Sequence, residues 1–311
     1  MNIAWYGFWY LIFPGFLFLI VCGVFVSWLD RKLTARLQFR VGPPLSQPLW
    51  DVLKLMGKET IIPRSASRGM FIFSPLLGLA GAVLAGAMLL VNAFWSEASF
   101  VGDVIVLIYF LLLPSLAIIL GGLASGNPIA GVGSAREMKL LFAYELSLLI
   151  ALGVVLIQTG GKLKIAEIVA WQASHRAIAL SISGALALIV SVFCAQAKLG
   201  AVPFDLAEAE TELSAGALIE YSGVLLGIYK LTRMIMLVVM PMFVVVIFLG
   251  GVKATLLGII WAIIKYLILL IVFVLIRNTN PRLRIDQAIR FFWYGMGGLG
   301  LVAIILAILG W

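Results

Sequence analysis

Eight apolar runs, each long enough to cross a bilayer, follow one another along the chain. Their approximate limits are 6–28, 71–95, 103–124, 138–159, 177–198, 216–248, 252–276 and 290–311. A spanning helix needs about 20 mostly apolar residues, and the 12% of charged residues here cannot cover a water-facing surface. We therefore predict an all-α polytopic membrane protein of about eight transmembrane helices, with 1–311 as one transmembrane domain. Only Gly250-Gly251 divides the sixth run from the seventh, so seven spans remain the alternative.

Lysine and arginine residues are divided unequally between the two sets of loops. If the N-terminus faces outward, the loops after the first, third, fifth and seventh helices hold 15 of them, and the opposite loops hold four. Basic loops stay on the cytoplasmic side of a membrane. We therefore expect a multi-pass protein of the cytoplasmic (inner) cell membrane with its basic loops in the cytoplasm. The net charge of +8 then needs no nucleic-acid partner.

The first cytoplasmic loop combines a basic helical face with an amphipathic segment. Lys32, Arg36 and Arg40 recur every four residues, and the helix that carries them would end at 42–44. After Pro48, apolar and charged residues alternate at helical spacing, which predicts an amphipathic helix at the membrane interface. Two interpretations remain open: attachment to lipid headgroups, or docking of a soluble partner.

The fourth apolar run carries two glutamates on the same predicted helix. Glu145 follows Glu137 by about two turns and lies inside the run, where an ionisable group is costly to bury. A structural salt bridge would require a fixed cation nearby. The favoured interpretation is that these acids handle protons or other ions.

The segment 201–223 has the highest density of acidic residues in the chain. Five of the 14 acids fall within 16 residues: Asp205, Glu208, Glu210, Glu212 and Glu220. On a helix, Glu208, Glu212 and Glu220 would lie near one face, with Glu220 inside the sixth span. Carboxylates crowded into a poorly solvated place have raised and coupled proton affinities. An acidic, solvated loop is the alternative.

The last cytoplasmic loop is again basic. Arg282 and Arg284 lie beside Asp286, either as a membrane anchor or as a partner surface. Cys22 and Cys194 lie in separate apolar runs without the spacing of a metal or iron–sulfur site, so we expect no metal and no catalytic residue in this chain.

Four segments, taken together and in order, resemble the membrane subunit that joins the hydrophilic and membrane arms in respiratory complex I and in group 4 membrane-bound [NiFe] hydrogenases. They read DRK…AR.Q.RVGPP…QP..D..KL..KE from Asp30, the pair Tyr144-Glu145, PFDL.EAE.EL…EYSG from Pro203, and PR.R.DQ from Pro281. They span nearly the whole chain. Asp30 and the short RVGPP form look more like the hydrogenase branch than like complex I.

The resemblance implies a subunit that anchors a redox module and performs no bond-making chemistry itself. It implies partners: a small subunit with an iron–sulfur cluster, a large subunit with a nickel–iron site, and antiporter-like membrane subunits. The acids named above would carry the coupling of electron transfer, from ferredoxin to protons, to H⁺ or Na⁺ translocation. The basic-loop residues would hold the partners. Two alternatives are a quinone-binding membrane component of complex I and a stand-alone secondary ion transporter.

Overall fold

The computed structural model describes residues 7–8, 11–95, 98–208, 212, 214–252 and 255–311, and within them every regular element is a helix. The long helices are α2 (Phe16–Leu37), α4 (Arg68–Phe94), α5 (Asp103–Ala124), α6 (Pro128–Gln158), α8 (Ile182–Lys198), α10 (Gly223–Phe248) and α11 (Leu256–Thr279). A last helical stretch comprises α12 (Ile285–Arg290), the π-helical η4 (Phe291–Met296) and α13 (Gly297–Ile308). The shorter elements are α3 (Gln47–Met56), α7 (Ile165–Ser174), η2 (Ile178–Leu180) and η3 (Gly216–Leu218).

Six of these helices, in the described part of the chain, are long and apolar enough to cross a membrane: α4, α5, α6, α10, α11 and the stretch from α12 to α13. The predicted break between the sixth and seventh runs is confirmed, because Gly250 and Gly251 both adopt positive φ between α10 and α11. The full count of eight is not confirmed. Helix α8 has only 17 residues, and α2 extends beyond its apolar run into a charged stretch.

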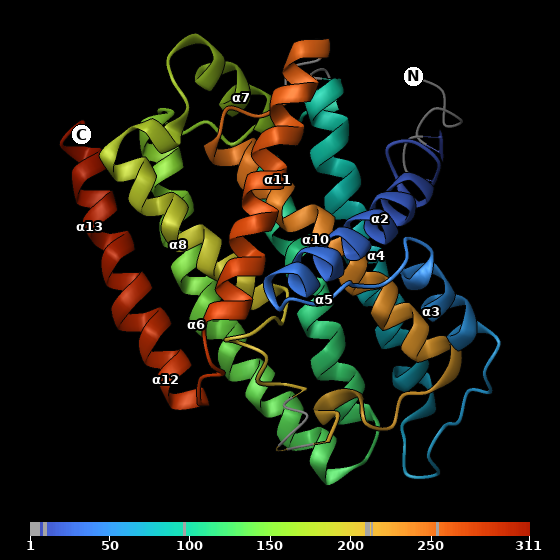
Figure 1. Cartoon of the computed structure of the whole chain (residues 1–311). Helices are drawn as coiled ribbons and strands as arrows, with labels where there is room; N and C mark the ends of the chain where they lie inside the picture. The colour runs from blue at the N-terminus through green and yellow to red at the C-terminus, as the bar shows by residue number, and fades with distance from the viewer. Residues whose placement is uncertain (1–6, 9–10, 96–97, 209–211, 213, 253–254) are drawn as a thin grey trace.

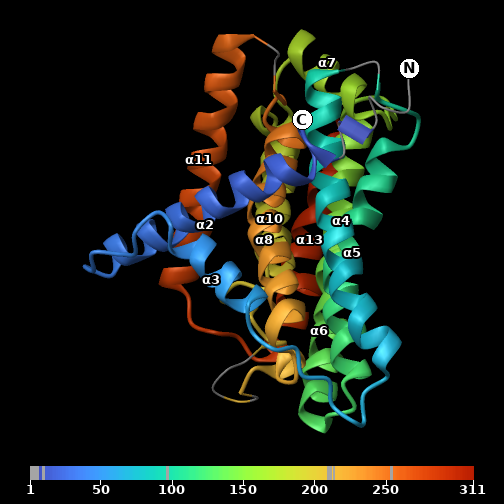
Figure 2. The same ribbon diagram turned by 90° about the vertical axis from the view of Figure 1, so that its right-hand side faces the viewer.

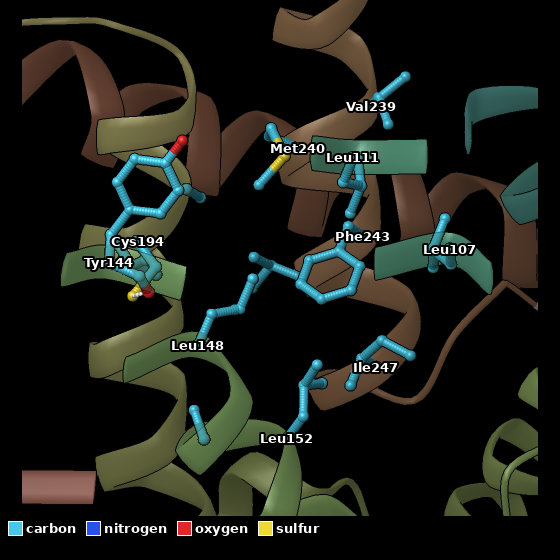
Figure 3. Packing of buried hydrophobic residues seen from close by; sticks show 14 of the residues in the cluster. Leu107, Leu111, Tyr144, Leu148, Leu152, Cys194, Val239, Met240, Phe243 and Ile247 are labelled. Atoms are coloured by element: carbon cyan, nitrogen blue, oxygen red, sulfur yellow. Dashed lines mark hydrogen bonds between the residues drawn. The ribbon is translucent and has the colours of Figure 1, made fainter. Parts of the chain in front are cut away.

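Helix α10 is the centre of the packing. In its most apolar 18-residue stretch 83% of the residues are buried, against 28% in α11, which lies at the edge of the bundle. In Figure 3, Phe243 of α10 lies between Leu107 of α5 and Leu148 of α6, and all three are fully buried. Close packing of this kind fixes the relative positions of α5, α6 and α10, which carry polar side chains nearer one end of the bundle.

Helix α2 is steeply inclined across the other helices, as both views show (Figures 1 and 2). The connection 57–67 and the start of α6 lie at the lower end of Figure 1, whereas α7 and the C-terminus lie at the upper end. Helix α3 occupies the predicted place in the first loop and packs against α2 and α10. It buries Pro48 and Val52 but leaves Leu49 and Leu53 exposed. Its cytoplasmic location stays a prediction.

Candidate functional site

The most deeply buried ion pair in the described structure joins α6 to α8. The Lys198 Nζ atom donates to Glu145 Oε2 over 2.6 Å, and the side chains are 1% and 12% exposed. The pair forms because α6 and α8 pack side by side, which brings the last residue of α8 next to the middle of α6. The second carboxylate oxygen of Glu145 has no hydrogen-bond partner among the described residues. Glu145 therefore has the fixed cation that a salt bridge requires, and one oxygen still available to accept a hydrogen bond.

Glu137 lies two turns before Glu145 on α6, as predicted, and is 4% exposed. It lines a cavity of about 60 Å³, together with Ser115 of α5 and Thr232 of α10. The Ser115 hydroxyl also hydrogen-bonds the Tyr144 hydroxyl over 2.9 Å. Polar groups thus continue along α6 from Glu137 towards Glu145. We call this space the smaller cavity.

The acidic segment, residues 201–222, does not form the single helix that the predicted row of carboxylates required. Residues 201–208 and 214–222 form turns and the short helix η3, and Glu212 between them is helical. One continuous helix from Glu208 to Glu220 is therefore wrong for the described residues. Asp205 instead accepts a hydrogen bond from Arg282 over 2.8 Å, and Glu208 accepts one from Arg233 over 2.8 Å. Both carboxylates line the smaller cavity.

The prediction that Glu220 lies inside the sixth span is also wrong. Gly216 and Gly223 both take positive φ, and α10 begins only at Gly223, so Glu220 lies in a turn before the helix. There it accepts a hydrogen bond from the Asn127 side chain over 2.5 Å. Glu212 is exposed and pairs with Arg136 of α6 over 2.6 Å. The predicted site residue Glu210 lies outside the described residues.

A larger cavity of about 360 Å³ lies beside the smaller one. Its charged lining comes from α2, α10, α11 and the acidic segment: Asp30, Arg31, Asp205, Lys230, Arg233 and Arg277. Arg277 donates to Asp30 over 2.9 Å, which ties α11 to α2. Asp205 and Arg233 line both cavities. Charged and polar groups therefore extend from α2 through two adjacent spaces to Glu137.

Two carboxylates of the acidic segment have shifted proton affinities. Burial, together with the neighbouring Glu208 carboxylate, raises the pKa of Asp205, while the positive charges of Arg233 and Arg282 oppose that rise. The hydrogen bond and charge of Arg136 lower the pKa of Glu212. Asp205 thus takes up a proton more readily than an ordinary aspartate, and Glu212 takes one up less readily than an ordinary glutamate.

The predicted docking residues fall into two groups. Lys32 and Arg36 lie on α2, but the helix ends at Leu37, so the prediction that Arg40 continues their helical face is wrong. The chain turns back there, since Phe39 has φ +58° and the Arg40 amide bonds the Ala35 carbonyl. Arg36 and Arg40 are both exposed, and Lys32 is half-buried.

The connection between α11 and α12, together with the start of α12, carries the other predicted docking residues. Arg284 and Asp286 lie at the start of α12, where Asp286 is exposed and Arg284 is the residue that caps the helix. Arg282 instead holds Asp205 inside the site, with its side chain 23% exposed.

Among the described residues, no group of three or more His, Cys, Asp or Glu side chains could hold a metal ion.

Sequence reasoning missed the cations that complete the site. Lys198 is one of the 15 basic residues that the topology assigns to the cytoplasmic loops, yet it lies opposite Glu145. Arg233 and Arg277 each bind an acid from a distant part of the chain. Arg233 lies within the sixth apolar run, and a basic residue in such a run is the one sequence signal that could have marked it.

Comparisons with known proteins place this architecture in a family. The family model described as NADH dehydrogenase matches residues 10–308. The chain is 35% identical over 305 residues to the H subunit of NADH-quinone oxidoreductase from Thermomicrobium roseum, covering 90% of this chain and 89% of that protein. It is 34% identical over 307 residues to an H subunit of NADH-quinone oxidoreductase from Syntrophobacter fumaroxidans, covering 93% and 91%.

A solved structure shares the fold. A chain of the membrane-bound sulfane sulfur reductase, an archaeal respiratory membrane complex, superimposes with a TM-score of 0.85 at 27% sequence identity. The match covers 94% of this chain and 96% of that one. The chain belongs to the NADH dehydrogenase family, as a membrane subunit of the type found in complex I-like respiratory complexes.

Proposed function

We propose that this subunit anchors the hydrophilic redox module of a membrane-bound hydrogenase-type complex and couples its electron transfer to H⁺ or Na⁺ translocation. Electrons would pass from ferredoxin to protons in the partner subunits, and this chain would bind no cofactor. A change of charge in those subunits would alter the protonation of the acids lining the two cavities. The basic loops would face the cytoplasm, where the redox module docks.

The observation that supports this proposal is the continuity of charged groups from α2 to α6. Asp30 and Arg277 lie at one end, Asp205 lies between the cavities, and Glu137 lies within the bundle. Buried ionisable groups in a membrane protein mark ion or proton pathways more often than structural features. A purely structural anchor would not need a titratable side chain at every step of this connection.

The proposed partners rest on the resemblance of the four sequence segments to membrane-bound [NiFe] hydrogenases. An iron–sulfur small subunit and a nickel–iron large subunit would contact the surface formed by Arg36, Arg40, Arg284 and Asp286. Antiporter-like membrane subunits would cover faces at the level of the lipid such as that of α11, because only 28% of the residues in its most apolar stretch are buried in the isolated chain. The exposed charges of the docking surface affect the rate and specificity of association more than they stabilise the fold.

A second candidate is a quinone-binding role. The relatives are named as H subunits of NADH-quinone oxidoreductase, and the larger cavity of about 360 Å³ falls within the size range of small-molecule sites. Composition of the natively purified complex distinguishes the two candidates. Iron together with nickel supports the hydrogenase type, whereas iron with bound quinone or flavin and no nickel supports the quinone type. A chain that purifies alone, without iron-containing subunits, would contradict both and indicate a transporter.

A further inference from the structure

The two cavities touch at a narrow shared wall. Among the described residues, four line both of them: Leu199, Gly200, Asp205 and Arg233. Three of these come from the connection after α8, and the fourth, Arg233, comes from α10. A direct path from the larger cavity to Glu137 in the smaller one runs past these four residues.

Arg233 holds the wall in place with both arms of its guanidinium group. Its Nη1 atom donates to Glu208 Oε2 over 2.8 Å, and its Nη2 atom donates to the Gly200 carbonyl oxygen over 2.7 Å. These two acceptors lie at the two ends of the stretch 200–208, which forms part of the lining of the smaller cavity. A planar guanidinium can bind two acceptors at once, which a lysine ammonium on a flexible stem does with less geometric definition.

The local backbone is shaped for this contact. Gly200 adopts φ +56°, a conformation that favours glycine, and a side chain built there would lie 3.9 Å from the Arg233 Nη2 atom. The Arg233 side chain is nevertheless 47% exposed, because it also faces the open larger cavity. The Arg233 side chain therefore lies between the two cavities and lines both.

We propose that Arg233 is a positioning residue that separates the two cavities, and that release of its clamp on 200–208 gives water and protons access to Glu137. The inference rests on the proposed coupling function. In the clamped state, Glu137 exchanges protons slowly with the larger cavity. When the 200–208 stretch moves away from Arg233, the two spaces join and Glu137 equilibrates with the side from which the redox module acts.

Lys230 provides a matched control. It lies three residues before Arg233 on α10 and also carries a positive charge, but it lines the larger cavity and not the smaller one. Removing either cation changes the charge of the larger cavity equally. Only the loss of Arg233 removes the clamp.

Accessibility of the smaller cavity tests the separation directly. In the purified complex, with Cys22 and Cys194 replaced by alanine, a Ser115→Cys thiol would report on the smaller cavity and an Ala201→Cys thiol on the larger one. The probe is aminoethyl methanethiosulfonate, a small cationic thiol reagent. Relative to the Ala201→Cys rate, Arg233→Ala should raise modification of Ser115→Cys at least about tenfold, a change of about 1.4 kcal/mol in the opening equilibrium. Lys230→Ala should leave the ratio within about twofold of the parent.

The outcomes separate this inference from the coupling proposal. An unchanged Ser115→Cys rate in Arg233→Ala, or an equal rise in Lys230→Ala, would overturn the partition. A second readout is passive proton leak through proteoliposomes, which should rise in Arg233→Ala and remain lower in Arg233→Lys. Raised labelling without any rise in leak would contradict the gating of Glu137. If the parent complex transports no ions, the coupling proposal fails while the labelling result still decides the partition.

Discussion

The Lys198 ammonium group lies 2.6 Å from Glu145 Oε2, with both side chains nearly removed from solvent. Breaking a buried pair by deleting one partner leaves an uncompensated charge, which costs about 3–5 kcal/mol. Lys198→Met should therefore lower the thermal stability of the assembled complex strongly, and the double variant Lys198→Met/Glu145→Gln should recover much of the loss. Thermal unfolding of the purified complex measures both. Equal stability of the single variant and the parent would show that the pair contributes nothing to the fold.

The raised pKa of Asp205 predicts a specific pH dependence of stability. A carboxyl group with a higher pKa in the folded state stabilises the protein fully below its unfolded pKa, and that stability is lost as the pH rises through the folded pKa. The melting temperature of the parent, relative to Asp205→Asn, should therefore fall as the pH is raised from about 4 towards neutrality. Thermal melts of the two proteins across this range provide the measurement. A relative melting temperature that rises with pH would contradict the assigned environment.

Charge reversal on the basic surface of the first loop should release the redox module. Arg36→Glu with Arg40→Glu should reduce co-purification of the soluble subunits as salt is increased, because screened interfacial charges no longer favour association. Arg282 is unsuitable for this test, since its charge holds Asp205. Arg176→Glu is the control, because this exposed arginine follows α7 at the opposite end of the bundle (Figure 1). Identical subunit ratios in the test and control variants would show that Arg36 and Arg40 do not contribute to the interface with the redox module.

The predicted orientation can be tested with two single cysteines. Ser46 precedes α3, and Ser174 ends α7; both are exposed. A membrane-impermeant thiol reagent added to intact cells should label Ser174→Cys and not Ser46→Cys, with the reverse result in inverted vesicles. Labelling of Ser46→Cys from outside would show that the true orientation is the reverse of the predicted one.

The helical architecture could be predicted from the sequence because hydropathy is a local property. The apolar runs at 71–95 and 103–124 became α4 and α5 with nearly the predicted limits. The same method misplaced Glu220, because an apolar average does not register the positive φ of Gly223, where the chain turns before α10 begins. Local patterns also overextended the basic face of α2 to Arg40.

The pairing of charges could not be predicted, because it depends on contacts between distant parts of the chain. Glu145 and Lys198 are 53 positions apart, and Asp30 and Arg277 are 247 apart. The acids themselves were found because charged residues are rare in this sequence. Their partners Lys198 and Arg277 could not be told apart from the other basic residues, because the membrane topology already accounts for basic residues in these loops.

The buried acids are central to the proposed coupling between electron transfer and ion translocation. The most direct measurement is ion uptake by proteoliposomes per hydrogen evolved, normalised to assembled complex, for Glu137→Gln beside the parent. Glutamine keeps the size and much of the hydrogen bonding of Glu137 but cannot titrate. The variant should assemble normally, and its ion uptake per hydrogen should fall to background. An unchanged ratio in an intact complex would contradict the acidic path and leave this chain an anchor for the redox module.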